Sequence, residues 1–109
     1  MAWLLRDGEV LATLEVADGF QSRLRGLLGR DGVNGALLLK PASSVHTFGM
    51  RFPIDVAFCD KDLRVVDTVR MPRHRLCRPR LRARCVIEAE AGAFERWRLR
   101  PGDELEIKA

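Results

Sequence analysis

The stretch His46-Thr47-Phe48-Gly49-Met50-Arg51-Phe52-Pro53-Ile54-Asp55 passes directly into the apolar run Val56-Ala57-Phe58-Cys59. Pro53 has no backbone donor and interrupts any sheet ladder, so the run that follows it begins a new strand. Because the run is apolar at consecutive positions, we expect a strand that is covered on both faces. The stretch therefore predicts a corner in the chain, followed by a central strand over 54–59.

Short apolar segments separated by turn residues extend in both directions from this strand. On its C-terminal side, Asp60-Lys61-Asp62 precedes an alternating segment over 63–70, which predicts a hairpin. On its N-terminal side, Asp7-Gly8 separates segments 2–6 and 9–17, which predicts a second hairpin. Further strands are expected over 85–90 and 104–108, with a helical turn over 93–99. This even spacing of turns favours an all-β sandwich or barrel.

One segment has a helical pattern. Asp18, with Gln21 three positions later, forms a capping-box signal, and Gly29 is well placed to end the helix. Between them, apolar residues recur at helical spacing: Phe20, Leu24, Leu27 and Leu28. We therefore predict a mostly β fold, a compact β-sandwich or barrel-like single domain over 1–109, with one flanking α-helix at about residues 19–28.

The composition is that of a small globular domain with free thiols. Of the 109 residues, 47% are hydrophobic, which is ample for a core in a chain of this size. The apolar runs are far too short to span a bilayer, and charge interrupts the N-terminus by Arg6, unlike a secretory signal. Three cysteines without a CxxC pair suggest neither disulfides nor zinc. We expect a cytoplasmic protein that does not enter membranes.

Several motifs accumulate along the chain in a fixed order. They are Arg23-Leu24-Arg25-Gly26-Leu27-Leu28-Gly29-Arg30, the segment 46–58, Met71-Pro72, the segment 83–92 and Arg100-Pro101-Gly102-Asp103. Their order and spacing resemble the domain-of-unknown-function family 192, over about residues 9–107. The resemblance implies a β-sandwich or barrel-like fold with one flanking helix and no assigned activity. Leu28 and Cys85 depart from it, since the family usually has a methionine and an aromatic residue there.

The resemblance also marks individual positions. The family's motif residues match Arg23, Gly26, Phe48, Met50, Pro53, Asp55, Glu88, Gly92 and Gly102. Glu88 and Glu90 lie two residues apart on their strand and so share a face. That spacing suits paired carboxylates, and it suits a solvated sheet face equally well.

Four residues of the opening stretch form the predicted ligand site: His46, Met50, Arg51 and Asp55. Extended backbone would place His46, Phe48, Met50 and Phe52 on one face. An ionised Asp55 inside an apolar strand is costly unless donors satisfy it. We predict a non-catalytic binding module whose shallow pocket accepts a small polar or anionic ligand or a protein segment. A structural alternative is that Asp55 accepts backbone N–H groups at the Pro53 corner or pairs with Arg51.

A second interpretation is a hydrolase-like enzyme that uses Asp55 and His46 as acid and base. Phosphate-binding glycine loops, a Ser-His-Asp order and dinucleotide fingerprints are absent from the sequence. With His74 as the only other histidine and no carboxylate at ligand spacing, we expect no metal and no cofactor. The sequence therefore favours binding over catalysis without deciding between them.

The basic character of the chain is local. Residues 70–84 contain seven of the 19 basic residues and no acidic one, which leaves 12 basic against 15 acidic side chains elsewhere, a net of −3. Nucleic-acid binding through Arg73, Arg75, Arg78 and Arg80 is a third interpretation. The stretch lacks interleaved aromatic residues that would stack on bases. The alternative is a solvated loop whose arginines pair with acidic residues elsewhere in the chain.

Overall fold

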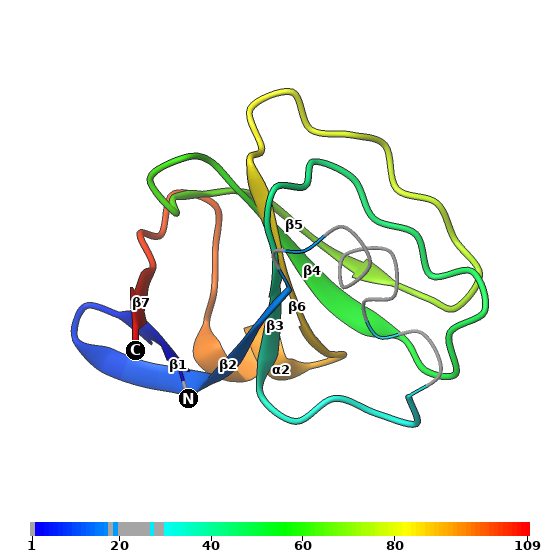
Figure 1. The fold of residues 1–109 in the computed structure, drawn as a ribbon, viewed down its shortest axis with the longest axis horizontal. Coiled ribbons are helices and arrows are strands. Elements are labelled where there is room, and N and C mark those ends of the chain that lie inside the picture. The colour runs from blue at the N-terminus through cyan, green and yellow to red at the C-terminus, as the bar shows by residue number, and fades with distance from the viewer. Residues whose placement is uncertain (1, 18, 20–26, 28–29) are drawn as a thin grey trace.

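The fold is a seven-stranded, strongly curved sheet with long loops along one side (Figure 1). The computed structural model describes residues 2–17, 19, 27 and 30–109. In chain order the elements are β1 (Ala2–Arg6), β2 (Glu9–Ala17), β3 (Ala36–Leu39), β4 (Ile54–Cys59), β5 (Val65–Met71), β6 (Cys85–Glu90), α2 (Ala93–Trp97) and β7 (Glu106–Lys108). The prediction of a mostly β chain is confirmed.

The strand order is β5-β4-β6-β3-β2-β1-β7, and only β2 and β3 pair in parallel. β4 lies between β5 and β6, and all six of its residues are buried. The predicted central strand and both predicted hairpins, β1 with β2 and β4 with β5, are therefore confirmed. The short helix α2 lies within the expected helical turn over 93–99.

The sheet curls until its two ends approach each other, without closing into a barrel. The chain ahead of β7 meets the chain ahead of β5, where the Leu105 amide donates to the Leu63 carbonyl at 3.0 Å. In the same place, the Val65 amide donates to the Asp103 carbonyl at 2.8 Å. The expected sandwich or barrel-like fold thus takes the form of an open, curled sheet.

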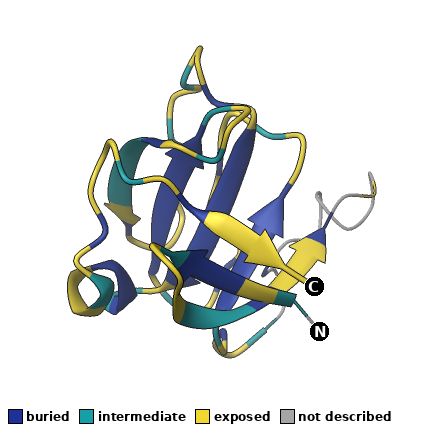
Figure 2. Ribbon diagram, turned by 90° about the vertical axis from the view of Figure 1, so that its left-hand side faces the viewer, coloured by how far each residue is buried: buried dark blue, intermediate teal, exposed yellow. Residues whose placement is uncertain are grey.

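Each face of the sheet carries its own hydrophobic core, because side chains alternate along the strands. On β6, Ile87 points into the core inside the curl, together with Leu4, Phe94 and Leu99. Its neighbour Val86 points into the opposite core, which also contains buried residues of the long loops. Figure 2 shows the central strands buried and β7 exposed. The long loops therefore cover the second face of the sheet.

The structure differs from the sequence-based expectations at two places. β3 was not expected, because its four apolar residues carry no alternation, and they are buried on both faces. The segment 45–52 is not a strand: it makes a single bridge at His46 and turns at Gly49, whose φ is +78°. The predicted helix over 19–28 lies almost entirely outside the described residues. No described helix is long and apolar enough to cross a bilayer.

We predict that Gly35 is essential where the chain enters β3. Its φ is +74°, and an added Cβ would lie 2.6 Å from the carbonyl oxygen of Thr13. Gly35→Ala should therefore lower the free energy of unfolding by about 2–4 kcal/mol in chemical denaturation. Gly8 is a matched control, since its φ is +80° and a Cβ there meets no atom within 4 Å. Gly8→Ala should cost about 1 kcal/mol, the strain of a positive φ alone, and equal effects would contradict the close approach.

Candidate functional site

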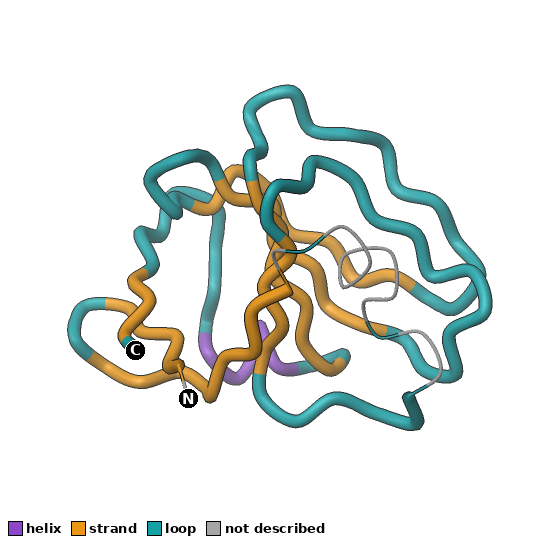
Figure 3. The backbone as a smooth tube through the Cα atoms, in the orientation of Figure 1, coloured by secondary structure: helices purple, strands orange, loops and turns teal. Residues whose placement is uncertain are grey.

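Two long loops, 40–53 and 72–84, run side by side on the outer side of the sheet (Figure 3), and we call them the paired loops. Thr47, which is fully buried, fastens one loop to the other. Its hydroxyl donates to the Pro72 carbonyl at 2.6 Å and accepts from the Arg75 amide at 2.8 Å. Its backbone amide donates to the Arg75 carbonyl at 2.7 Å, and its carbonyl accepts from the His74 amide at 2.9 Å.

The pairing continues along both loops. The Cys77 amide donates to the Val45 carbonyl, and the Arg80 amide to the Ser43 carbonyl, each at 2.9 Å. The Gly49 amide donates to Nδ1 of His74 at 3.2 Å. These bonds satisfy backbone groups that would otherwise need strand partners. The arginine-rich stretch and the 46–55 segment are therefore one structural unit.

The exposed surface of the paired loops carries two stacked rings. His46 and Phe48 have ring centroids 5.6 Å apart and planes 25° apart, and Phe48 is 50% exposed. The expected common face of His46, Phe48, Met50 and Phe52 is wrong, because the turn at Gly49 reverses the alternation. His46 and Phe48 face solvent, whereas Met50 is buried in the core beneath the loops.

Arg51 is exposed at the edge of the same loop. Its guanidinium donates to Oδ1 of Asp31 at 2.6 Å, and both side chains are largely open to solvent. A single ion pair that is so exposed contributes little to stability. The Arg51 side chain is therefore held only by this exposed ion pair. It does not pair with Asp55, as one alternative expected.

Asp55 is 3% exposed and has a structural set of partners. Oδ2 accepts from the backbone amides of Gly92 at 2.9 Å and Phe94 at 3.1 Å, at the start of α2. Oδ1 accepts from Nε of Arg70 at 3.1 Å. The expectation that backbone donors satisfy this carboxylate is met, but by α2 and not by the Pro53 corner. With both oxygens occupied, Asp55 is poorly placed to act as an acid or base with His46.

The arginines of residues 70–84 divide into two groups. Arg80 is structural: its Nε donates to Oδ2 of Asp67 at 2.9 Å, and its guanidinium carbon lies 4.5 Å from the centre of the Phe58 ring. Arg73, Arg75, Arg78, Arg82 and Arg84 are exposed, and none of them forms an ion pair with any described residue. The expected pairing of these arginines with acidic residues therefore holds for only part of the stretch.

Glu88 is a buried carboxyl that the sequence analysis undervalued. On β6 it is 3% exposed, in register with Leu37 of β3 and Val56 of β4, and no hydrogen bond reaches it from the described residues. Burial raises its pKa to about 7. Glu90 faces solvent instead and pairs with Arg96 at 2.6 Å. The signal that singled out Asp55, a carboxylate in an apolar strand, applies equally to Glu88.

The described residues offer no ready metal site. No cluster of three or more histidine, cysteine, aspartate or glutamate side chains in 2–17, 19, 27 and 30–109 is arranged to hold an ion. Cys59 and Cys85 are buried free thiols opposite each other on β4 and β6, and Cys77 is a half-buried free thiol.

We predict that Asp55 stabilises the fold chiefly through the two backbone donors of α2. Asp55→Ala should cost about 3 kcal/mol, because it leaves buried amides unsatisfied. Arg70→Ala should cost about 1 kcal/mol or less, since the Arg70 side chain is 55% exposed. Urea denaturation of both variants measures the difference. A loss at Arg70 as large as that at Asp55 would assign the stability to the ion pair instead.

We also predict that Glu88 makes stability depend on pH. Its carboxyl titrates near 4.5 in the unfolded chain and at about 7 in the folded one. The protonated form therefore favours the folded state, and stability falls as pH rises through this window, by about 3 kcal/mol in total. Glu88→Gln should remove most of that fall in denaturation measured from pH 4 to 8. A variant whose pH dependence matches that of the parent would contradict the assignment.

The chain resembles proteins whose activity is likewise unassigned. It is 33% identical to the UPF0127 protein of Pyrococcus horikoshii over 91% of this chain and 87% of that one. It is 36% identical to a UPF0127 protein of Thermococcus gammatolerans over 83% of this chain, but spans only 63% of that relative's length.

A solved structure from Sinorhizobium meliloti, described as a candidate transcription regulator, has the same fold. Its TM-score is 0.83 at 22% identity, over 96% of this chain and 90% of that one. The family model DUF192, described as uncharacterized ACR, matches residues 2–107. The chain therefore belongs to the DUF192 family, which has no assigned function.

Proposed function

We propose that this protein is a non-catalytic binding module that takes an anionic ligand, or an anionic segment of another protein, on the outer surface of the paired loops. His46 and Arg51 provide the exposed contacts from the predicted site. Met50 supports that surface from the core beneath the loops, whereas Asp55 lies on the opposite face of β4 and binds the start of α2. The proposal includes a cytoplasmic location, for which free cysteines are typical.

The observation that carries the proposal is the difference between two sets of arginines. Arg6, Arg30, Arg51, Arg64, Arg70, Arg80 and Arg96 each form an ion pair with a carboxylate. Arg73, Arg75, Arg78, Arg82, Arg84, Arg98 and Arg100 form none with the described residues, and the first five of these seven lie together in the loop 72–84. Guanidinium groups left unpaired on one surface can bind phosphate or carboxylate groups in a bidentate geometry.

The way in which these arginines are held adds to the argument. Arg75 contributes both its amide and its carbonyl to Thr47, so its side chain projects from a backbone that is hydrogen-bonded on both sides. Its neighbour Leu76 forms the bridge with His46. A preordered backbone lowers the entropy lost on binding. The stacked His46 and Phe48 rings and the free cations therefore form one prearranged surface.

Single-stranded nucleic acid is a second candidate ligand class, favoured by the exposed Phe48 ring. The sequence shows no aromatic residue among the arginines, but the pairing of the loops brings His46 and Phe48 alongside them. Bases stack on such rings while guanidinium groups bind the backbone. The Sinorhizobium meliloti protein described as a candidate transcription regulator is consistent with this class, although 22% identity shows the fold alone.

The test is binding of three probes: inorganic pyrophosphate, a polyglutamate peptide and an oligothymidine. We expect at least one to bind at low ionic strength, and the double variant Arg73→Gln/Arg75→Gln to weaken it at least tenfold. If the oligothymidine binds through three phosphate contacts, the slope of log K against log salt should be about −2. Calorimetry and fluorescence anisotropy measure these affinities.

The matched control is Arg30→Gln/Arg64→Gln, which removes the same charge from two ion-paired arginines elsewhere. It should leave binding within about twofold of the parent, because the affected side chains lie off the paired loops. If both double variants weaken binding equally, the effect is one of net charge and the proposed surface is wrong. Absence of binding by all three probes at millimolar concentration would also overturn the proposal.

A further inference from the structure

A cavity of about 260 Å³ opens between the turn that joins β4 to β5 and the last residues of the loop before β6. Because Cys59 is in register with Cys85, these two segments lie at the same end of the sheet, at the top in Figure 1. All the residues that line the cavity are charged: Asp60, Lys61, Arg82 and Arg84. Three cations against one carboxylate leave a net charge of +2, which attracts an anion.

The Arg84 side chain is held in place by the backbone beside it. Its Nη1 donates to the carbonyl oxygens of Leu81 and Ala83, each at 3.0 Å. Its own amide donates to the Cys59 carbonyl at 2.7 Å, so the main chain is fixed here as well. Nε and Nη2 have no hydrogen-bond partner among the described residues. These two nitrogens form the side of a guanidinium that binds two oxygens of a phosphate group at once.

The facing wall is a turn that Asp60 holds together. Its Oδ1 accepts from the amides of Asp62 at 2.9 Å and Arg64 at 3.0 Å, and its own amide donates to the Arg64 carbonyl at 3.0 Å. The bond from the Arg64 amide, that from the Asp62 amide and the charges of Arg64 and Arg82 lower the pKa of the Asp60 carboxyl. Lys61 therefore projects from an ordered turn, and Arg82 lies close enough to that turn for its charge to act there.

The cations of this cavity are not neutralised within the described part of the chain. Lys61, Arg82 and Arg84 are exposed and form no ion pair with any residue there, whereas Arg64, on the same turn, pairs with Glu104. Their charge is therefore available to a ligand.

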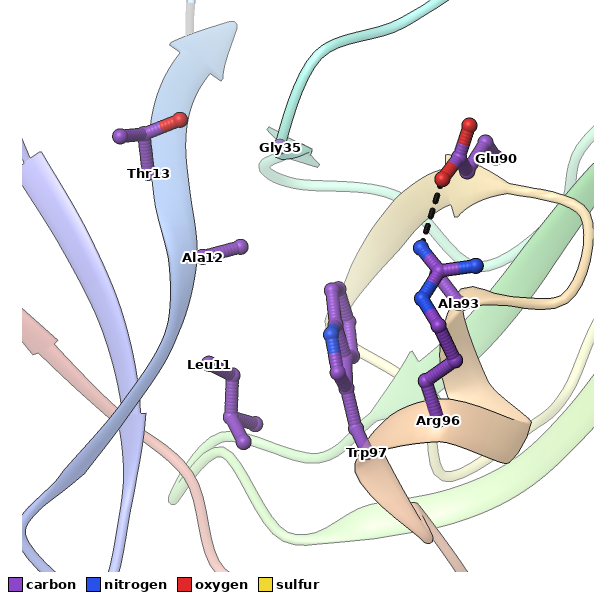
Figure 4. Close-up of a pocket in the computed structure, with 8 residues that line it drawn as sticks. All are labelled: Leu11, Ala12, Thr13, Gly35, Glu90, Ala93, Arg96 and Trp97. Atoms are coloured by element: carbon purple, nitrogen blue, oxygen red, sulfur yellow. Dashed lines mark hydrogen bonds and ion pairs between the residues drawn. The ribbon is translucent and has the colours of Figure 1, made fainter.

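A second cavity, of about 290 Å³ beside β2, has the opposite arrangement (Figure 4). Its charged lining residues are Glu90 and Arg96, which pair with each other at 2.6 Å. Figure 4 shows the Arg96 guanidinium turned toward the Glu90 carboxylate, above Trp97. That cavity is neutral, so its charge does not select an anion.

We infer that the cavity between residues 60–62 and 82–84 binds a phosphate group, either free or at the end of a small phosphorylated molecule. Arg84 holds two phosphate oxygens through Nε and Nη2, and Lys61 and Arg82 neutralise the remaining charge. A phosphate group carries about −1.5 to −2 charges near pH 7, which matches the cavity, whereas a single carboxylate does not. The volume lies below the range of about 300–1,000 Å³ that is typical of drug-sized ligands, so the occupant is small.

This site goes beyond the proposed function. Lys61 does not belong to the paired loops, and neither Arg73 nor Arg75 lines the cavity. The two sites can therefore be tested separately, with the same ligand.

The experiment is a titration of the ¹⁵N-labelled full chain with inorganic phosphate and with glycerol 3-phosphate, near neutral pH and at low ionic strength. Amide shifts should concentrate at residues 60–62 and 82–84. Tighter binding of the ester would identify a phosphorylated molecule as the ligand, and tighter binding of inorganic phosphate would identify the free ion. Shifts confined to residues 46–48 and 73–75 would support the proposed function alone and overturn this inference, as would no shifts at millimolar ligand.

Three double variants separate the cavity from other cations. Lys61→Gln/Arg82→Gln should weaken phosphate binding at least tenfold. Lys108→Gln/Arg98→Gln removes the same charge at β7 and after α2, away from the cavity, and should leave binding within about twofold. Arg73→Gln/Arg75→Gln should also leave it within about twofold. Equal losses in all three variants would show an effect of net charge, and a loss in Arg73→Gln/Arg75→Gln alone would place the phosphate on the paired loops; either result would overturn the inference.

A variant that gains affinity completes the test. In Asp60→Asn, Oδ1 still accepts from both backbone amides of the turn, but the negative charge of the cavity is gone. Phosphate binding should tighten at least threefold, because the repulsion between like charges is removed. A misfolded protein does not gain affinity, so this variant decides the result even if the double variant at Lys61 and Arg82 fails to fold. Unchanged or weaker binding would contradict the site.

Discussion

The buried carboxylate of Asp55 is the constraint from which the arrangement of the other elements follows. A charge in the middle of a central strand is tolerated only if donors surround it. Two of those donors are backbone amides at the start of α2, and the third is Arg70 on β5. Asp55 therefore fixes where α2, with Trp97 at its end, docks inside the curl. Through Arg70, Asp55 also contacts β5 near its C-terminal end, where the second of the paired loops begins. A residue expected to bind a ligand thus acts by holding other surfaces in place.

Glu88 lies on the same pair of central strands but faces the opposite side. Its register partner on β4 is Val56, next to Asp55, so the two carboxyls occupy opposite faces of almost the same point in the sheet. Asp55 is satisfied by three donors, whereas Glu88 receives none from the described residues and its pKa is raised by burial. The two carboxyls therefore have different environments, although both match the family's motif.

The sequence predicts the regular parts of this fold well and the irregular parts poorly. The central strand at 54–59, the two hairpins and the strand at 85–90 follow from turn residues and local apolar patterns, which act over a few positions. β3 escapes detection because a four-residue strand buried on both faces carries no alternation. The surface of the paired loops could not be predicted from the sequence for a different reason. Thr47 has no local signal, yet its hydroxyl and backbone groups join positions about 25 residues apart. Such bonds depend on tertiary packing, so the proximity of Phe48 to the arginines could not be predicted.

The paired loops show why long irregular segments can still serve as a binding surface. Loops usually leave backbone groups to solvent and lose order as a result. Here, the amides of Thr47, His74, Arg75, Cys77 and Arg80 are bonded across the pair, and Val45 and Met50 anchor it in the core. These bonds across the pair involve no guanidinium group of Arg73, Arg75 or Arg78. Arg70 and Arg80, by contrast, form ion pairs that join elements, with Asp55 and Asp67. The bonds of Thr47 and its neighbours therefore hold the backbone of the paired loops without ion pairs from Arg73, Arg75 and Arg78.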